Sequence, residues 1–235
     1  MIDTLFFDVD DTLLDFGACE RNALQNALQK NGYPFHESMY QWYHTFNLSL
    51  WKQFERGEID RDAVLHSRFT ALFEKYGIRN GDAVRFEEDY IDALSEQYVL
   101  APGALAVVQA LSKQYRLYIV TNGVARSQYR RLSASGLAEY MQDIFISEEI
   151  GSQKPQKAFF DACFLRMGVG EAARKRVMIV GDSLTSDIKG GRDAGLVTCW
   201  YHADERVRDI DVVPDYEIRA LDELLCLLLP SEKGE

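Results

Sequence analysis

Short apolar runs and segments of helical periodicity alternate along most of the chain. The run Thr4–Phe7 is β-prone and mostly apolar, which is typical of a strand buried inside a parallel sheet. Further strands are predicted at Leu117–Val120, Ile144–Ile146, Val177–Val180 and Leu196–Trp200. Helices are predicted before, between and after these strands, at Gly103–Lys113, Arg126–Ser135, Lys157–Met167, Ser186–Ala194 and Ala220–Leu229. The alternation predicts an α/β fold with a doubly wound, Rossmann-like parallel sheet.

The segment that follows the first predicted strand has a different pattern. From about Asp15 to Leu100 no strand is predicted, and apolar residues recur at helical spacing between breaks at Gly32-Tyr33-Pro34, Gly57 and Gly77. We therefore predict an all-α insert over residues 15–100, with residues 1–14 and 101–235 forming the α/β domain. Parallel sheets bind ligands at the carboxyl ends of their strands, so an insert at this point is placed to cap a site. The alternative is a helical subdomain that only adds core. A loose tail is expected at Ser231–Glu235.

Composition narrows the class of protein. The 235 residues suffice for a large domain with an insertion, and a hydrophobic content of 47% excludes a disordered chain. The net charge of −11 argues against a nucleic acid polymer or an anionic membrane as partner, because both require basic surfaces. No signal peptide is visible, and the longest late apolar run, Leu224–Leu229, is too short to span a bilayer. We expect a cytoplasmic protein that is a monomer or a weak homodimer.

The cysteines support a reducing compartment. Cys19, Cys163, Cys199 and Cys226 are scattered, with no C-x-x-C pair and no histidine cluster nearby. This spacing favours buried free thiols over disulfides or a zinc site.

Polar residues recur near the ends of successive predicted strands. They are Asp8 and Asp10, Thr121 and Asn122, Lys154, and Asp182 and Asp187. Any one of them is ordinary, since acidic residues after a strand can form a solvated turn. Enclosed carboxylates repel one another and lose water, however, so the acidic groups predict a metal ion or an arriving positive charge. Their shared order indicates one site.

This set of residue types suits phosphoryl transfer. A carboxylate attacks a phosphate monoester dianion only with a cation between them, and Mg²⁺ fits because it takes few carboxylates and keeps positions for water and substrate. The side chains of Thr121, Asn122 and Lys154 would bind the remaining phosphate oxygens. A second carboxylic acid would protonate the leaving oxygen and then activate water. We therefore predict a small-molecule phosphate monoester as the substrate.

Four segments resemble the motifs of the haloacid dehalogenase (HAD) superfamily. They are Asp8-Val9-Asp10-Asp11-Thr12-Leu13, Thr121, Lys154-Pro155 and Gly181-Asp182-Ser183-(x)3-Asp187, in that order. The resemblance implies a Rossmann-like core with a helical cap of the C1 type. It also implies that Asp8 forms an aspartyl-phosphate and that Asp10 is the general acid/base. Mg²⁺ would be bound by Asp8, the backbone carbonyl of Asp10 and Asp182, with Asp187 acting through water.

A closer resemblance is to pyrimidine-type 5′-nucleotidases. It rests on Leu50-Trp51-(x)2-Phe54-Glu55-(x)-Gly57, Arg68-Phe69, Thr121-Asn122-Gly123, Ile146–Gly151 and Ala194–Trp200. It implies a pyrimidine nucleoside 5′-monophosphate as the substrate, for which Phe16, Trp51 and Arg68 are candidate contacts in the insert. Aromatic residues at helical spacing can equally form the insert's own core.

Other functions fit the same set of residues. Among enzymes these are a small sugar-phosphate or phosphoglycolate-type phosphatase and a phosphomutase. Outside enzymes, a phospho-aspartyl receiver or a phosphate-sensing regulator also places acids, threonine and lysine on a doubly wound sheet. A receiver is far shorter, has no capping insert and has no use for an acid two residues after the acceptor.

Overall fold

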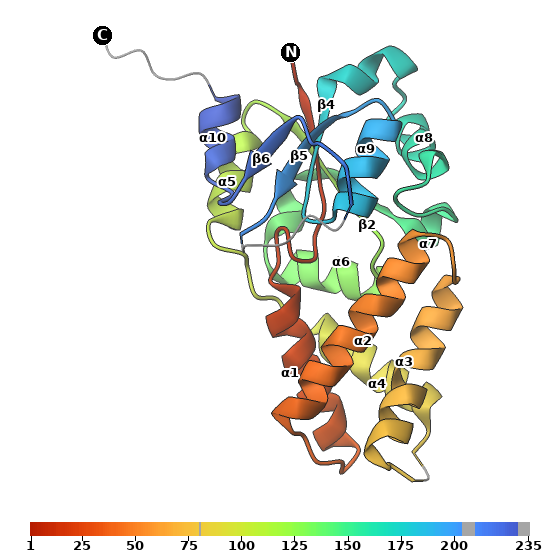
Figure 1. Cartoon of the computed structure of the whole chain (residues 1–235). Helices are drawn as coiled ribbons and strands as arrows, with labels where there is room; N and C mark the ends of the chain where they lie inside the picture. Colours follow the sequence, from red (N-terminus) through yellow and green to blue (C-terminus); the bar gives the residue numbers. More distant parts are fainter. Residues whose placement is uncertain (80, 204–209, 230–235) are drawn as a thin grey trace. The chain divides into compact units, whose positions relative to one another are not determined.

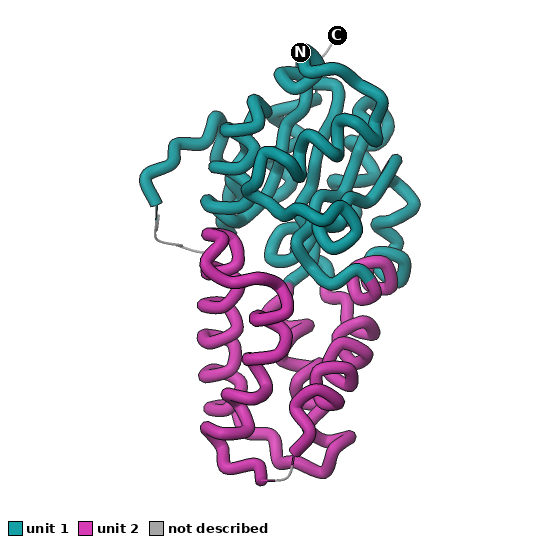
Figure 2. Tube along the Cα trace, turned by 90° about the vertical axis from the view of Figure 1, so that its right-hand side faces the viewer, with its two compact units in different colours: residues 1–15, 100–125, 132–235 teal, residues 16–99, 126–131 magenta. Residues whose placement is uncertain are grey.

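The computed structural model describes residues 1–79, 81–203 and 210–229. The chain forms two compact units, shown in different colours in Figure 2. The first, which we call the sheet unit, contains Met1–Asp15, Leu100–Ala125 and Leu132–Glu235, and the second, the helical unit, contains Phe16–Val99 and Arg126–Arg131. The predicted tail Ser231–Glu235 lies outside the described residues.

A six-stranded parallel sheet is the centre of the sheet unit (Figure 1). Its strands are β1 (Thr4–Phe7), β2 (Arg116–Thr121), β3 (Met141–Ile146), β4 (Val177–Gly181), β5 (Val197–Tyr201) and β6 (Tyr216–Ile218). The strand order is β3-β2-β1-β4-β5-β6, and every neighbouring pair is parallel. The predicted doubly wound α/β fold is confirmed. Because the chain leaves β1 toward β2 on one side and returns to β4 on the other, the carboxyl end of β1 is a topological switch point, where such sheets bind ligands.

Helices connect the strands. They are α5 (Ala104–Leu111), α6 (Ala125–Ala134), α7 (Ser147–Ile150), α8 (Lys157–Arg166), α9 (Gly190–Asp193) and α10 (Glu223–Leu228), with 3₁₀ turns η1 (Leu137–Tyr140) and η2 (Glu171–Arg176) and a π-helical turn η3 (Leu184–Lys189). The helix predicted over Ser186–Ala194 is present, since η3 and α9 follow one another without a gap over residues 184–193, and the first part of it is π-helical. Strand β6 was not predicted, since its three residues are too few to establish an alternating pattern.

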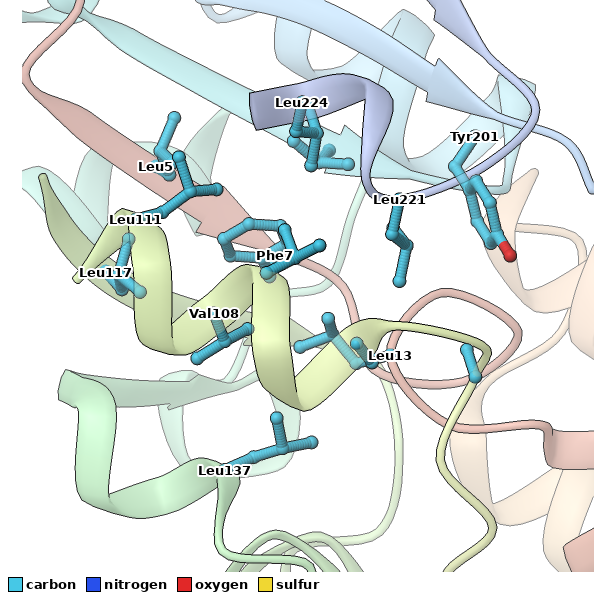
Figure 3. Close-up of a cluster of buried hydrophobic side chains, with 14 of the residues drawn as sticks. Leu5, Phe7, Leu13, Val108, Leu111, Leu117, Leu137, Tyr201, Leu221 and Leu224 are labelled. Carbon is cyan, nitrogen blue, oxygen red and sulfur yellow. The ribbon is translucent and has the colours of Figure 1, made fainter. Parts of the chain in front are cut away.

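Both faces of the sheet are buried by apolar side chains. Leu5 and Phe7 of β1 point to the face covered by α5 and α10, where Figure 3 shows them with Val108 and Leu224. Phe6 points to the opposite face, among aromatic side chains of β2, β3 and α8. Burial on both faces explains why β1 is apolar without alternation.

The helical unit contains four helices from the insert. They are α1 (Phe16–Lys30), α2 (Glu37–Glu55), α3 (Arg61–Tyr76) and α4 (Ala83–Ser95). Gly77 ends α3 in the left-handed conformation, with a φ of 66°, and the Asp60 side chain caps the start of that helix. None of the described helices is both long and apolar enough to cross a membrane.

The cysteine prediction was correct for three residues and wrong for one. Cys19, Cys163 and Cys199 are buried free thiols, whereas Cys226 is exposed. Cys226 lies on α10 two residues after the fully buried Leu224. Two residues correspond to about 200° of helical rotation, so Cys226 faces away from the core.

Candidate active site

The loop after β1 holds Asp8 at the carboxyl edge of the sheet. The carbonyl of Val9 accepts hydrogen bonds of 2.9 Å from the backbone N–H groups of both Leu13 and Leu14, which folds the loop back on itself. Asp11 has a φ of 59°, a left-handed conformation that aspartate tolerates better than most residues. Val9, Leu13 and Leu14 are fully buried. Apolar anchors and backbone hydrogen bonds therefore fix the position of Asp8.

Lys154 joins the ends of separate strands through its ammonium group. Its Nζ donates to Asp8 Oδ1 at 2.7 Å, to Asp187 Oδ1 at 2.7 Å and to the carbonyl of Val120 at 2.8 Å. The side chain is 1% exposed. The Asn122 amide fixes the lysine backbone, because its Nδ2 donates to the Lys154 carbonyl at 2.9 Å and its Oδ1 accepts from the Lys154 N–H at 3.0 Å. The side chain of Asn122 therefore positions Lys154, a role that the sequence analysis did not anticipate.

Both close packing and hydrogen bonds hold Asp187 in place. It lies on η3 and is fully buried, and its Oδ2 accepts from the Ser183 N–H at 3.1 Å. A Cβ atom at Gly181 would lie 2.3 Å from Asp187 Cγ and 2.3 Å from Oδ2. Only glycine leaves room at position 181 for the carboxylate that binds Lys154.

Two threonines and Asp10 complete the surroundings of Asp8. Thr12, which is fully buried, donates from Oγ1 to Asp8 Oδ2 at 3.2 Å. Thr121 ends β2, is 1% exposed, and accepts from the Gly123 N–H at 3.0 Å. Asp10 is half-buried, and its backbone pairs with that of Leu14 in an isolated bridge.

The negative charge of the carboxylates in this site is not balanced by the positive charge of Lys154. Burial raises the pKa of Asp8 to about 7, with further increases from Asp187 and Asp10, while Lys154 opposes the rise. Burial lowers the pKa of Lys154, but the adjacent carboxylates of Asp187 and Asp8 outweigh it, so that this pKa is raised overall and the ammonium stays charged. One ammonium therefore faces more acidic groups than it can neutralise.

The site fits a hard divalent cation. Among the described residues, carboxylate oxygens of Asp8, Asp182 and Asp187 lie within 4.8 Å of one another. Asp10 does not contribute a carboxylate to this group. An all-oxygen donor set with excess negative charge suits Mg²⁺ or a similar ion, which would supply the missing charge.

The three predicted substrate contacts of the insert lie in different surroundings. Phe16 and Trp51 are half-buried. Arg68, in contrast, has a side chain that is only 2% exposed and donates from Nε to Glu87 Oε2 at 2.9 Å. It also donates from Nη1 to Asn47 Oδ1 at 3.3 Å. The guanidinium of Arg68 is thus bonded inside the helical unit, and nothing in this geometry supports a contact with substrate.

The site also contains residues that sequence reasoning missed. Thr12 and Gly181 stood inside quoted motifs without an assigned role, and no local pattern marks them as neighbours of Asp8 and Asp187. Their spacing of four and six residues from those aspartates becomes a contact only through the loop after β1 and the turn into η3.

Comparison with known proteins identifies the family of this chain. A family model described as haloacid dehalogenase-like hydrolase matches residues 2–195. The HAD-hydrolase YfnB of Bacillus subtilis is 44% identical over 225 residues, which are 96% of this chain and 94% of that protein. A crystal structure of YfnB bound to magnesium superposes with a TM-score of 0.91 and 43% identity, covering 97% of this chain and 99% of that chain.

Two relatives carry the name of a specific enzyme. The pyrimidine 5′-nucleotidase PynA of Streptococcus pneumoniae is 34% identical over 95% of this chain and 94% of that protein. The pyrimidine 5′-nucleotidase YjjG of Escherichia coli is 34% identical over 96% of this chain and 97% of that protein. From the family match, these relatives and the shared fold, this chain belongs to the haloacid dehalogenase-like hydrolase family.

Proposed function

We propose that this protein is a Mg²⁺-dependent phosphomonoesterase that hydrolyses pyrimidine nucleoside 5′-monophosphates through an aspartyl-phosphate at Asp8. The observation that carries the proposal is the ammonium of Lys154, which lies 2.7 Å from carboxylate oxygens of both Asp8 and Asp187. It orients the Asp8 carboxylate at a strand end and partly neutralises it. Mg²⁺ held by Asp8, Asp182 and the backbone carbonyl of Asp10, with Asp187 nearby, would supply the remaining positive charge.

In the first step, a carboxylate oxygen of Asp8 attacks phosphorus. A new O–P bond forms as the bond from phosphorus to the leaving oxygen breaks, and Asp10 donates its proton to that oxygen. Thr121 binds a phosphate oxygen while charge shifts toward it, and the ammonium of Lys154, whose three N–H groups are donated to Asp8, Asp187 and Val120, offsets that charge from its place beside Asp8. The products of this step are the free alcohol and a phosphorylated Asp8.

In the second step, the Asp10 carboxylate takes a proton from water. The water oxygen attacks phosphorus, the bond from phosphorus to Asp8 breaks, and inorganic phosphate leaves. Asp8 is again a carboxylate and Asp10 is again protonated. The sum is one ester and one water converted to one alcohol and one phosphate.

The choice of nucleotide rests on PynA and YjjG, which are both named pyrimidine 5′-nucleotidases and match this chain over nearly its full length. We assign catalysis to residues 1–14 and 101–235 and substrate selection to residues 15–100. Within the insert, Phe16 and Trp51 are the half-buried aromatic candidates for a contact with the base. Arg68 is not retained as a candidate, because its guanidinium is bonded to Glu87 and Asn47.

Two measurements test the proposal. Asp8→Asn keeps the volume of the side chain but cannot attack phosphorus, so it should abolish release of phosphate from p-nitrophenyl phosphate while circular dichroism stays that of the wild type. An active, folded Asp8→Asn protein would refute the mechanism.

In a substrate panel, UMP, dUMP or dTMP should give a higher kcat/KM than glucose 6-phosphate or phosphoglycolate. If a phosphosugar gives the highest value, the nucleotide assignment fails and the mechanism stands.

A further inference from the structure

Helix α6 is shared by the two units. Its residues Arg126–Arg131 group with the helical unit, whereas Ala125 and the residues from Leu132 onward group with the sheet unit. The helix begins at Ala125, four residues after the proposed phosphate ligand Thr121. This helix is therefore continuous with the phosphate-binding turn at one end and packed among residues of the insert along its middle.

Arg131 contacts both ends of the insert. Its Nε donates to the backbone carbonyl of Gln97 at 3.1 Å, and its guanidinium carbon lies 5.8 Å from the centroid of the Phe16 ring. Phe16 is the first residue of the inserted segment and Gln97 stands two residues before its last residue, Val99. The side chain of one residue thus contacts both the start and the end of the insert.

The two segments that begin and end the insert, residues 13–19 and 97–101, also bond to each other, and we call them the linkers. The N–H of Val99 donates to Cys19 Sγ at 3.3 Å. Leu14 and Leu100 form an antiparallel bridge, and the N–H of Ala101 donates to the carbonyl of Leu13 at 2.9 Å. The linkers therefore form a short paired segment, which Arg131 connects to α6.

The chemistry of this contact is unusual for a helix face that is packed away from water. Arg131 and its neighbours Ser127 and Gln128 lie within one turn of each other and are 1%, 2% and 1% exposed. Apolar side chains would bury the same face at lower cost, because a buried polar group is unfavourable unless it is hydrogen-bonded. A planar guanidinium that donates in a fixed direction and lies against a ring holds its partners in a defined position.

We propose that Arg131 is a positioning residue that holds Phe16 and Gln97, at the start and the end of the insert, against α6 and so fixes the ring of Phe16, the candidate contact for the base. This inference rests on the proposed phosphatase function. Arg131 acts through Phe16 and Gln97. Its loss should therefore affect a substrate whose leaving group is bound by the insert more than a substrate that offers little beyond its phosphate.

The helix supplies a matched control. Arg130 is the next residue along α6 and is exposed, so Arg130→Met makes the same chemical change without breaking the contacts of Arg131. We expect Arg131→Met to lower kcat/KM for UMP by about tenfold, the size expected for one lost hydrogen bond from a charged donor. The loss should be mainly in KM, and p-nitrophenyl phosphate should be affected by less than about twofold. Gln97→Ala should match the wild type, because the bond to Arg131 uses the backbone carbonyl.

Equal losses for both substrates, or kinetics that match those of Arg130→Met, would overturn the inference. If the wild type turns over neither substrate, the proposed function fails, and a measurement independent of activity decides the role of Arg131.

That measurement is hydrogen exchange of the linker amides. We expect exchange at Val99 and Ala101 to be about tenfold faster in Arg131→Met, while exchange in β1 and β4 stays as in the wild type. Arg131→Lys keeps the charge but not the planar fork, so its linker amides should exchange at rates between those of the wild type and Arg131→Met. If Arg131→Met does not fold, Arg131→Lys is compared with the wild type instead. Unchanged linker exchange in a folded variant would show that Arg131 does not hold the linkers.

Discussion

One added methyl group at Gly181 should disable the candidate site by displacing the carboxylate of Asp187. In Gly181→Ala, the new Cβ would lie 2.3 Å from Asp187 Cγ, 2.3 Å from Oδ2 and 2.7 Å from Cβ. Non-bonded carbon atoms are in favourable contact at about 3.5–4.0 Å, so the carboxylate must move by more than about 1 Å. The hydrogen bond from Lys154 Nζ to Asp187 Oδ1, now 2.7 Å long, would then exceed the usual range.

The expected cost follows from these contacts. Overpacking a tight interior typically costs about 1–3 kcal/mol, and a hydrogen bond to a charged group contributes about 1.5–3 kcal/mol. We therefore expect Gly181→Ala to reduce the free energy of unfolding by about 3 kcal/mol. With an m-value of about 3 kcal/mol/M, the midpoint of urea denaturation should fall by about 1 M. Turnover should fall as well, because Lys154 would lose one of the two carboxylates that orient it.

The control is Gly170→Ala. Gly170 has a φ of −80°, and a Cβ there would meet no atom within 4 Å, so we expect no loss of stability and a gain of at most about 1 kcal/mol. Urea melts followed by circular dichroism, with p-nitrophenyl phosphate turnover, compare the two variants. In an Asp187→Ala background both 2.3 Å contacts disappear and the 2.7 Å contact with Cβ remains, so Gly181→Ala should cost less there but still more than Gly170→Ala. Equal costs in the two backgrounds would refute the steric argument.

Two further predictions concern the lysine and the metal. Asn122→Ala removes both hydrogen bonds between the amide and the backbone of Lys154. The kcat for p-nitrophenyl phosphate should therefore fall by about tenfold. Wild-type kinetics in this variant would show that Lys154 does not need the Asn122 amide. Excess EDTA should stop turnover and added Mg²⁺ should restore it. Asp182→Ala should raise the Mg²⁺ concentration needed for half-maximal activity more than Asp187→Ala does. The reverse order in a Mg²⁺ titration would contradict the assigned ligands.

Much of the fold could be predicted because its signals are local. The apolar run of β1 and its neighbours indicated buried parallel strands, and the glycine breaks in the insert marked helix ends. The polar groups at the strand ends could be identified as one site because parallel strands direct their carboxyl ends to a single edge. Chain order and residue type were sufficient for that conclusion.

Contacts inside the helical unit were not predictable in the same way. Helical periodicity places Arg68 on α3, but the choice between a ligand and a buried partner of Glu87 depends on which helix packs beside it. The exposure of Cys226 was also not predictable, because the packing of α10 on the sheet unit decides which of its faces is buried.

By itself, the sequence placed Asp8, Lys154 and Asp187 in segments that follow three strands of one parallel sheet. Only the tertiary structure decided that one ammonium bridges the two carboxylates, across a separation of 146 residues to Asp8. It also decided that Asn122 holds the backbone of Lys154, that Gly181 leaves space for Asp187, and that Arg131 contacts Phe16 and Gln97. Each of these depends on distances between residues that are not neighbours in the chain, and no periodicity encodes such distances, because they are set by how the elements pack together.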